Sequence, residues 1–255
     1  MQLAAHFLGE FRVVVDGHLV DTASSRRTRT LVAYLLAHRR SPVARDVLME
    51  RFWPDASPLA ARNSLHVALS GARRVFRAAA ADDVIQRRFD TYRIDAAARV
   101  WTDVEEFERT CRAGRRADFA GDRASAERHF ETAVQLYQGD FLADEPYAEW
   151  AAAIRDGLRQ QAIEVQTRLV EMYADRGDHG PASVLARRIL AIDPCNERVH
   201  RRLMDSYAAA GLRHLALMQF HQVSGTLWET LRVRPSAETI GLYERLRRPE
   251  LAHIA

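Results

Sequence analysis

Short runs of alternating hydrophobic and polar positions begin the chain. Residues 3–8, 11–15 and 18–20 are rich in side chains that favour strands. Asp16-Gly17 separates the second run from the third, and Asp-Gly in that place is a strong signal for a tight hairpin turn. The first 20 residues are therefore predicted to form a small antiparallel sheet.

Helical periodicity follows this alternating region. Residues 26–38 have the spacing of one helix, which Ser41-Pro42 ends, and residues 45–52 have that of a second, which Trp53-Pro54 ends. A third and longer helix is predicted over residues 59–80. The pattern after the strands therefore predicts three helices in succession.

The predicted third helix has two unlike faces. Its apolar stripe has the spacing of a buried helix face and consists of Leu65, Ala68, Leu69, Ala72 and Phe76. On a wheel of about 100° per residue, the opposite side collects the base-facing candidates Asn63, His66, Val67, Ser70, Arg74 and Arg77. No acidic residue occurs from residue 56 to residue 81. The helix is thus suited to an anion, and nucleic acid is favoured because each phosphate neutralised by Arg releases counterions.

A second hairpin is predicted after this helix, because residues 84–88 and 92–94 flank Phe89-Asp90-Thr91. Strands, three helices and a terminal hairpin in this order are typical of a winged helix-turn-helix. In that fold the third helix enters the major groove of DNA, and the hairpin lies along the adjacent backbone. Strands before the helices favour the response-regulator type. Residues 1–101 are therefore predicted to be an α+β winged helix-turn-helix DNA-binding domain.

From residue 102 to residue 248 the pattern is helical and contains a repeat. The pairs 34 residues apart are Leu169 and Leu203, Tyr173 and Tyr207, Gly177 and Gly211, and Ala182 and Ala216. That period is typical of the tetratricopeptide repeat, a helix-turn-helix unit with a small residue where its helices touch. Gly121 and Ala126 have the same Gly-to-Ala spacing. We therefore predict an all-α tetratricopeptide-like domain over residues 102–248 and a tail over residues 249–255.

Charge is unevenly distributed along the chain. The formal net charge is +3, but residues 1–100 hold 16 Arg against 10 acidic residues, whereas residues 101–255 hold 21 Arg against 24. The first part is suited to an anionic partner. Phosphate-binding candidates lie at the start of the first helix, where free N–H groups attract anions, beside the third helix and in the second hairpin: Arg26, Arg27, Arg29, Arg62, Arg73, Arg87, Arg88 and Tyr92. A solvated surface is the alternative interpretation of these charges.

The composition argues against several classes of protein. All 37 basic residues are Arg, so sites that depend on lysine are excluded. No glycine-rich phosphate loop, nucleophile elbow or HExxH motif occurs, and Cys111 and Cys195 lack metal-ligand spacing. We predict a protein that is not an enzyme and has no metal or cofactor. No signal-peptide pattern and no 18-residue apolar run occur, which favours a cytoplasmic, nucleoid-associated protein without membrane contact.

The chain resembles the Streptomyces antibiotic regulatory protein (SARP) family of bacterial transcriptional activators. Over residues 3–246, the stretches that carry this resemblance are LGEFRVVVDG, RRTRTLVAYLLAHR, FWPDASPLAARNSLHVALSGARRVF and YQGDFLADEPYAEWAAAIRDGLR. The last, residues 137–159, is the most specific, because its Gly-Asp-Phe-Leu and later Glu-Trp have no generic rationale in a helix. Ala72 departs from the larger aliphatic residue that is usual in the family.

The resemblance implies a winged helix joined to a bacterial transcriptional activator domain. It further implies binding to promoter direct repeats by two protomers side by side, and recruitment of the RNA polymerase holoenzyme. The loop of residues 53–58 is implied as a polymerase contact; Asp55 is its exposed candidate, while Trp53 is better explained as a cap on the core. The ATPase and sensor modules of larger members are not in this sequence, so a short, stand-alone member is expected.

Two other functions stay open at this point. A protein-interaction adaptor would capture partners through residues 103–248 and use the winged helix for structure only. An enzyme with an unfamiliar site is the weaker alternative. Tyr147 and Trp150 are predicted to be core anchors, with ligand binding on the concave face of the repeats as the alternative.

Overall fold

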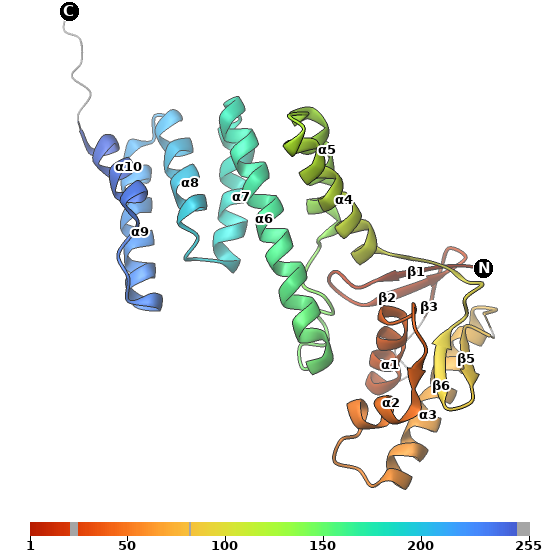
Figure 1. The fold of residues 1–255 in the computed structure, drawn as a ribbon. Helices are drawn as coiled ribbons and strands as arrows, with labels where there is room; N and C mark the ends of the chain where they lie inside the picture. The colour runs from red at the N-terminus through yellow and green to blue at the C-terminus, as the bar shows by residue number, and fades with distance from the viewer. Residues whose placement is uncertain (21–24, 82, 249–255) are drawn as a thin grey trace, which may run out of the picture. The chain divides into compact units, whose positions relative to one another are not determined.

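The computed structural model describes residues 1–20, 25–81 and 83–248, so the predicted tail 249–255 lies outside the described residues. The chain forms two compact units, and Figure 1 labels most of their elements. The first unit consists of Met1–Arg109 and Gln135–Arg159, and the second of Thr110–Val134 and the chain from residue 160 onward. In the described residues the last strand ends at Thr102 and the next helix begins at Asp103, and the two units cut across the predicted boundary between residues 101 and 102.

The first unit combines short strands with three helices. Its strands are β1 (Gln2–His6), β2 (Arg12–Val15), β3 (His18–Val20), β4 (Val43–Ala44), β5 (Ile85–Arg88), β6 (Thr91–Ile94) and β7 (Arg99–Thr102). Its helices are α1 (Arg26–Ala37), α2 (Arg45–Phe52) and α3 (Pro58–Ala78), with the 3-10 turn η1 (Glu149–Ala151). The strands and helices predicted within residues 1–101 are present, with ends shifted by about two residues at most, as is usual for element boundaries.

The strands of this unit form two small sheets. In the four-stranded sheet the order is β3-β2-β1-β7; β1, β2 and β3 pair antiparallel, whereas β7 runs parallel to β1. The three-stranded sheet has the order β4-β6-β5 with antiparallel pairs. The sequence pattern does not predict β4 or β7, because β4 has two residues and β7 pairs with a strand at the opposite end of the unit's sequence.

The core of this unit is formed by the apolar residues that alternate along the strands and recur along one face of the helices. Every second residue of β1 and β2 faces inward, and Leu3 and Val13 are at most 1% exposed. The apolar stripe predicted for α3 is buried at all five positions, so the prediction of a buried helix face is confirmed. Ser57 caps the helix through its side-chain oxygen, and Pro58 occupies the first turn, where its missing N–H is harmless.

A segment far along the chain completes the first sheet. We call residues 137–151 the cover segment. Leu8 and Phe141 form an antiparallel bridge, and the Leu142 N–H donates to the Phe7 carbonyl at 2.8 Å. The rings of Phe7 and Phe141 stack with centroids 5.2 Å apart. Residues more than 130 positions apart in sequence thus share one core.

The two aromatic residues predicted as core anchors in the cover segment are placed differently. Trp150 packs edge-on against Tyr34 at a centroid distance of 5.0 Å, so it is an anchor between the cover segment and α1. Tyr147 is 83% exposed, so the prediction that it is a core anchor is wrong. The loop beside it is held by Arg155, which donates to the carbonyl oxygens of Phe141, Glu145 and Pro146.

Asp103 joins the end of β1 to the start of α4 (Asp103–Phe119). Its side chain is buried and accepts the backbone N–H groups of Phe7 and Leu8 at 2.8–2.9 Å, and that of Val104 at 2.8 Å. Burial raises the pKa of the Asp103 carboxyl, although these N–H donors and nearby His6 act in the opposite direction. The carboxylate therefore pairs N–H groups that follow the last residue of β1.

The second unit is helical in its described residues. Its elements are the end of α4, most of α5 (Arg123–Leu136), most of α6 (Ala152–Arg176), α7 (His179–Ile192), α8 (Glu197–Ala209), α9 (Arg213–Leu231) and α10 (Ala237–Arg247). The connections α4–α5, α6–α7 and α8–α9 are short, so consecutive helices form antiparallel pairs.

One turn is used three times in this unit. Gly121, Gly177 and Gly211 have φ of 78°, 88° and 75°, the left-handed region that favours glycine. At each site the glycine N–H bonds to the carbonyl three residues back, and the next N–H bonds to the carbonyl five residues back, which is a Schellman motif. The alanine five residues after each glycine is fully buried: Ala126, Ala182 and Ala216. The Gly-to-Ala spacing in the sequence thus reflects a repeated helix end and helix contact.

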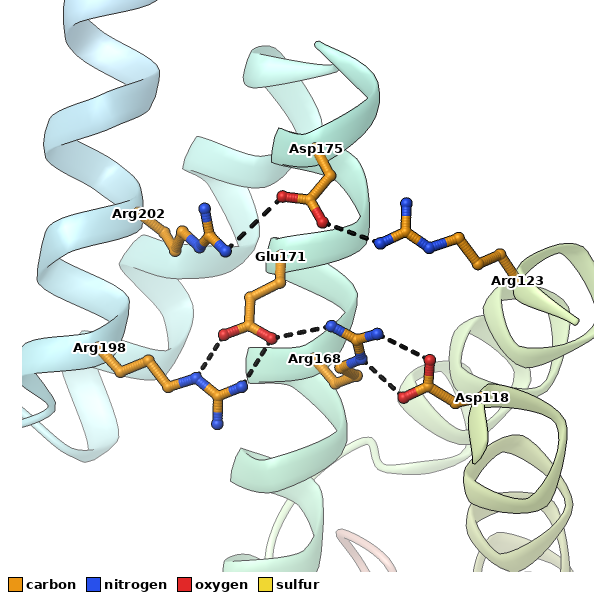
Figure 2. A network of polar contacts seen from close by, with 7 residues as sticks. All are labelled: Asp118, Arg123, Arg168, Glu171, Asp175, Arg198 and Arg202. Atoms are coloured by element: carbon orange, nitrogen blue, oxygen red, sulfur yellow. Dashed lines mark hydrogen bonds and ion pairs between the residues drawn. The ribbon is translucent and has the colours of Figure 1, made fainter. Parts of the chain in front are cut away.

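Ion pairs cross the second unit from α4 over α6 to α8 (Figure 2). Arg168 donates from Nε and Nη2 to the Asp118 carboxylate at 2.7 Å and from Nη1 to Glu171 at 3.2 Å. Glu171, whose side chain is 5% exposed, also accepts from Arg198 Nη2 at 2.7 Å. The hydrogen bonds from Arg168 lower the pKa of the Asp118 carboxyl.

Asp103→Ala is expected to lower the free energy of unfolding by about 1–3 kcal/mol, because it leaves buried N–H groups without an acceptor. Urea unfolding measures the change. Glu50→Ala is the matched control, since Glu50 is exposed on α2, and it should change stability by about 0.5 kcal/mol or less. Equal effects of the two substitutions would contradict the role given to Asp103.

The low pKa of Asp118 predicts an acid-dependent contribution to stability. A carboxyl whose pKa is lower in the folded state stabilises the fold above its unfolded pKa of about 3.9 and loses that contribution as pH falls through the folded pKa. Asp118→Asn should therefore be less stable than the wild type above pH of about 4, and the difference should close on further acidification. Urea unfolding across this pH range tests it; a constant difference would refute it.

Candidate nucleic-acid interface

The polar side of α3 is exposed along its length. All six base-facing candidates predicted for this helix are exposed: Asn63, His66, Val67, Ser70, Arg74 and Arg77. Val67 is 73% exposed, and Leu59, one turn from Asn63 on the same helix, is 71% exposed. The first turn of α3 carries no acidic residue, so nothing there opposes the positive end of the helix dipole.

A basic groove lies between the C-terminal half of α3 and the hairpin of β5 and β6. Its volume is about 500 Å³, and five guanidinium groups line it against the single carboxylate of Asp83: those of Arg73, Arg77, Arg87, Arg88 and Arg93. Arg73 Nε donates to the Ile85 carbonyl at 3.3 Å, and Arg87 Nε donates to the Phe89 carbonyl at 3.0 Å. These bonds hold positive charge along the groove, where an anion would meet it.

In the β5–β6 hairpin, the structure contradicts the prediction for Tyr92 and identifies Arg93 as a further residue of the groove. Tyr92 is 1% exposed and belongs to the core, so the prediction that it contacts phosphate is wrong. Tyr92 and Ile94 point inward on β6, and Arg93 between them faces the groove. Sequence reasoning misses Arg93, although the period-two alternation of this strand could have separated it from Tyr92. Phe89 at the turn is 88% exposed.

Two arginines at the start of α1 are engaged within the first unit. Arg26 Nε donates to Glu145 at 2.7 Å; this hydrogen bond raises the pKa of Arg26. Arg29 donates to the Phe11 carbonyl at 2.9 Å and forms an ion pair with Asp144. Both carboxylates belong to the cover segment. A phosphate would have to compete with them for these guanidinium groups.

The third arginine of α1 lies beside the loop between α2 and α3. Arg27 is exposed; its guanidinium stands 5.6 Å from the centre of the Trp53 ring and donates to the Phe52 carbonyl at 3.2 Å. Trp53 is half-buried, packs against Phe52 and ends α2. Asp55 is exposed in the same loop.

Within the candidate interface, three exposed arginines keep their full donor capacity: Arg62, Arg74 and Arg88. Within residues 1–20, 25–81 and 83–248, the structure gives their guanidinium groups no ion pair and no hydrogen bond. Arg62 and Arg74 lie on α3, and Arg88 lies at the end of β5. These three residues are therefore the least encumbered sites for an anion.

Other kinds of site find no support in the part of the chain that the structure describes. There, His, Cys, Asp and Glu side chains form no group of three or more that could hold a metal ion. Across the same residues, every helix is too short or too polar to cross a membrane.

Comparison with known proteins gives the family. Residues 102–247 match the family described as bacterial transcriptional activator domain. The chain is 26% identical over 224 residues to the transcriptional regulatory protein MoaR1 of Mycobacterium tuberculosis, covering 87% of this chain and 72% of MoaR1. It is 27% identical over 229 residues to the regulatory protein DnrI of Streptomyces peucetius, covering 85% of this chain and 82% of DnrI.

A solved structure has a similar fold. It is Mycobacterium tuberculosis EmbR in complex with a low-affinity phosphopeptide, with a TM-score of 0.78 and 23% sequence identity. The match covers 96% of this chain but 64% of the EmbR chain, so this chain spans less than two thirds of EmbR.

These matches place the chain among bacterial transcriptional regulators. It belongs to the bacterial transcriptional activator domain family, and its relatives are regulators of the SARP group, as the resemblance in the sequence indicates.

Proposed function

We propose that this protein is a sequence-specific DNA-binding transcriptional activator. In this proposal the first unit is a winged helix-turn-helix, α3 enters the major groove, and the β5–β6 hairpin follows the adjacent backbone. The second unit is a tetratricopeptide-like repeat domain that contacts the transcription machinery. The observation that carries the proposal is the exposed, acid-free face of α3 beside the arginine-lined groove.

Base recognition is assigned to the centre of the α3 face. Arg74 and Arg77 have the planar fork that binds guanine O6 and N7, and Asn63 has the amide that pairs with adenine N6 and N7. Val67, as an exposed aliphatic side chain, suits a thymine methyl group. His66 and Ser70 lie between them on the same exposed face.

Phosphate contacts are assigned to the edges of the same surface. Arg62 and Arg73 flank the α3 face, and the hairpin contributes Arg87, Arg88 and Arg93. Arg27 adds a contact at the start of α1. Contacts of this kind set affinity and orientation without reading sequence.

The partners follow from the family resemblance and stay proposals. Two protomers would bind side by side on promoter direct repeats, and the loop with Trp53 and Asp55 would contact the RNA polymerase holoenzyme. Asp55 is the better candidate, because it is exposed while Trp53 is half-buried against Phe52 and Arg27. A cytoplasmic, nucleoid-associated location would follow from this role.

A matched pair of substitutions on α3 tests which arginine contacts a base and which contacts a phosphate. Arg62 and Arg74 are the same residue type, both exposed and both without a described partner. Arg74→Ala should remove about 1–3 kcal/mol of discrimination at one base pair. Arg62→Ala should weaken all sequences about equally and reduce the salt slope of log affinity by about 1. Selection from random DNA gives the site, and fluorescence anisotropy across salt concentrations gives both quantities.

The outcomes separate the proposal from its alternative. Identical behaviour of the two variants would contradict the assigned roles. A protein-interaction adaptor remains the alternative function; in that case the wild type would show no sequence preference at low salt, and the double reversal Arg73→Glu and Arg74→Glu would leave partner capture by the repeat unit unchanged.

A further inference from the structure

A polar pocket of about 410 Å³ lies in the second unit where α6, α8 and α10 meet. Four guanidinium groups and three carboxylates line it. Among the lining residues, positive charge therefore exceeds negative charge by one.

Three of the four arginines form ion pairs, and two of these three, Arg198 and Arg201, also donate hydrogen bonds. Arg198 donates to Glu171 from both Nε and Nη2, as Figure 2 shows. Arg201 forms an ion pair with Glu238 at 2.7 Å and donates to the Thr239 hydroxyl at 3.0 Å. These two pairs are neutral and form walls of the pocket.

The other two arginines keep free donors. Arg202 faces Asp175 across 3.6 Å, which is too long for a hydrogen bond, and Asp175 accepts one from Arg123 at 3.1 Å (Figure 2). Arg245 is exposed and has no ion pair or hydrogen bond within the described ranges 1–20, 25–81 and 83–248. Two guanidinium groups thus offer unfilled N–H donors at one pocket.

Asp205 is the remaining carboxylate of the pocket. It is half-buried on α8 and accepts no hydrogen bond from a described residue. Burial raises its pKa, while Arg202, Arg245, Arg201 and His179 act in the opposite direction. Its oxygens are available to an N–H donor of a ligand.

We propose that this pocket binds an acidic peptide, with a carboxylate of the peptide held by Arg202 and Arg245 and its backbone N–H groups donating to Asp205. The planar guanidinium fork matches a carboxylate and binds it through two parallel bonds. The single excess charge suits one carboxylate, and the three wall carboxylates oppose a polyanion such as nucleic acid. All lining residues belong to the second unit, so the inference does not depend on DNA binding by α3.

The test measures peptide binding to the full chain by fluorescence anisotropy. The probe is a short, capped, fluorescein-labelled Ser-rich peptide with a single Glu, compared with the same peptide carrying Gln in its place. The wild type should bind the Glu peptide at least tenfold more tightly. The double variant Arg202→Gln and Arg245→Gln should lose about tenfold or more, the loss expected for one charge-assisted hydrogen bond.

Two further variants test whether peptide binding depends on the charges of the pocket or on the overall charge of the protein. Asp205→Asn keeps an acceptor oxygen but removes the competing charge, so it should tighten binding of the Glu peptide. Arg187→Gln removes an exposed charge of α7 outside the pocket and should leave binding unchanged. Thermal unfolding followed by circular dichroism verifies that each variant is folded.

Three results would overturn the inference. One is equal binding of the Glu and Gln peptides by the wild type. Another is an equal loss from Arg187→Gln and from the double variant. The third is displacement of the Glu peptide by inorganic phosphate or by short duplex DNA at lower concentration than by the unlabelled Glu peptide, which would indicate a phosphate or nucleic-acid site.

Discussion

The hydrogen bonding of the chain just after β1 is the constraint on which the first unit depends. Among the described residues no strand pairs with residues 7–9, so the Asp103 carboxylate and the backbone of the cover segment supply their partners. This pairing places Phe141 on Phe7 and Trp150 on Tyr34, and so fixes the cover segment against the sheet and α1. The segment lies within the region that matches the activator domain family, yet it completes the core of the N-terminal unit. Cutting the chain between residues 101 and 102 would remove both Asp103 and the cover segment.

Carboxylates of the cover segment also bind two of the arginines on α1 that were candidates for phosphate contacts. Its carboxylates Asp144 and Glu145 pair with Arg29 and Arg26 on α1. In the second unit, Arg168 and Arg198 are likewise bound to carboxylates. Arg62, Arg74 and Arg88 differ because the described residues offer them no acid. In the first unit, Arg26 and Arg29 are thus structural residues held by carboxylates, whereas Arg62, Arg74 and Arg88 are candidate recognition residues.

The sequence predicts what depends on neighbours along the chain. Periodicity identified the buried stripe and the exposed side of α3, and the spacing of Gly177 and Gly211 identified a turn that recurs. Contacts between distant segments were not predictable in this way. The pairing of β7 with β1 and the capture of Arg26 and Arg29 by the cover segment depend on residues far away in sequence. Tyr92 stands beside charged residues in the sequence, but its position in β6 directs its side chain into the core.

Methylation interference at guanine N7 is a direct test of whether α3 reads base edges in the major groove. DNA selected by the wild-type protein would be methylated sparsely with dimethyl sulfate, and bound and free fractions would be compared. Methylation of particular guanines should block binding, and Arg74→Ala should abolish the interference at one of them, because Arg binds guanine at O6 and N7. Binding that is indifferent to N7 methylation at every guanine of the selected site would contradict the account.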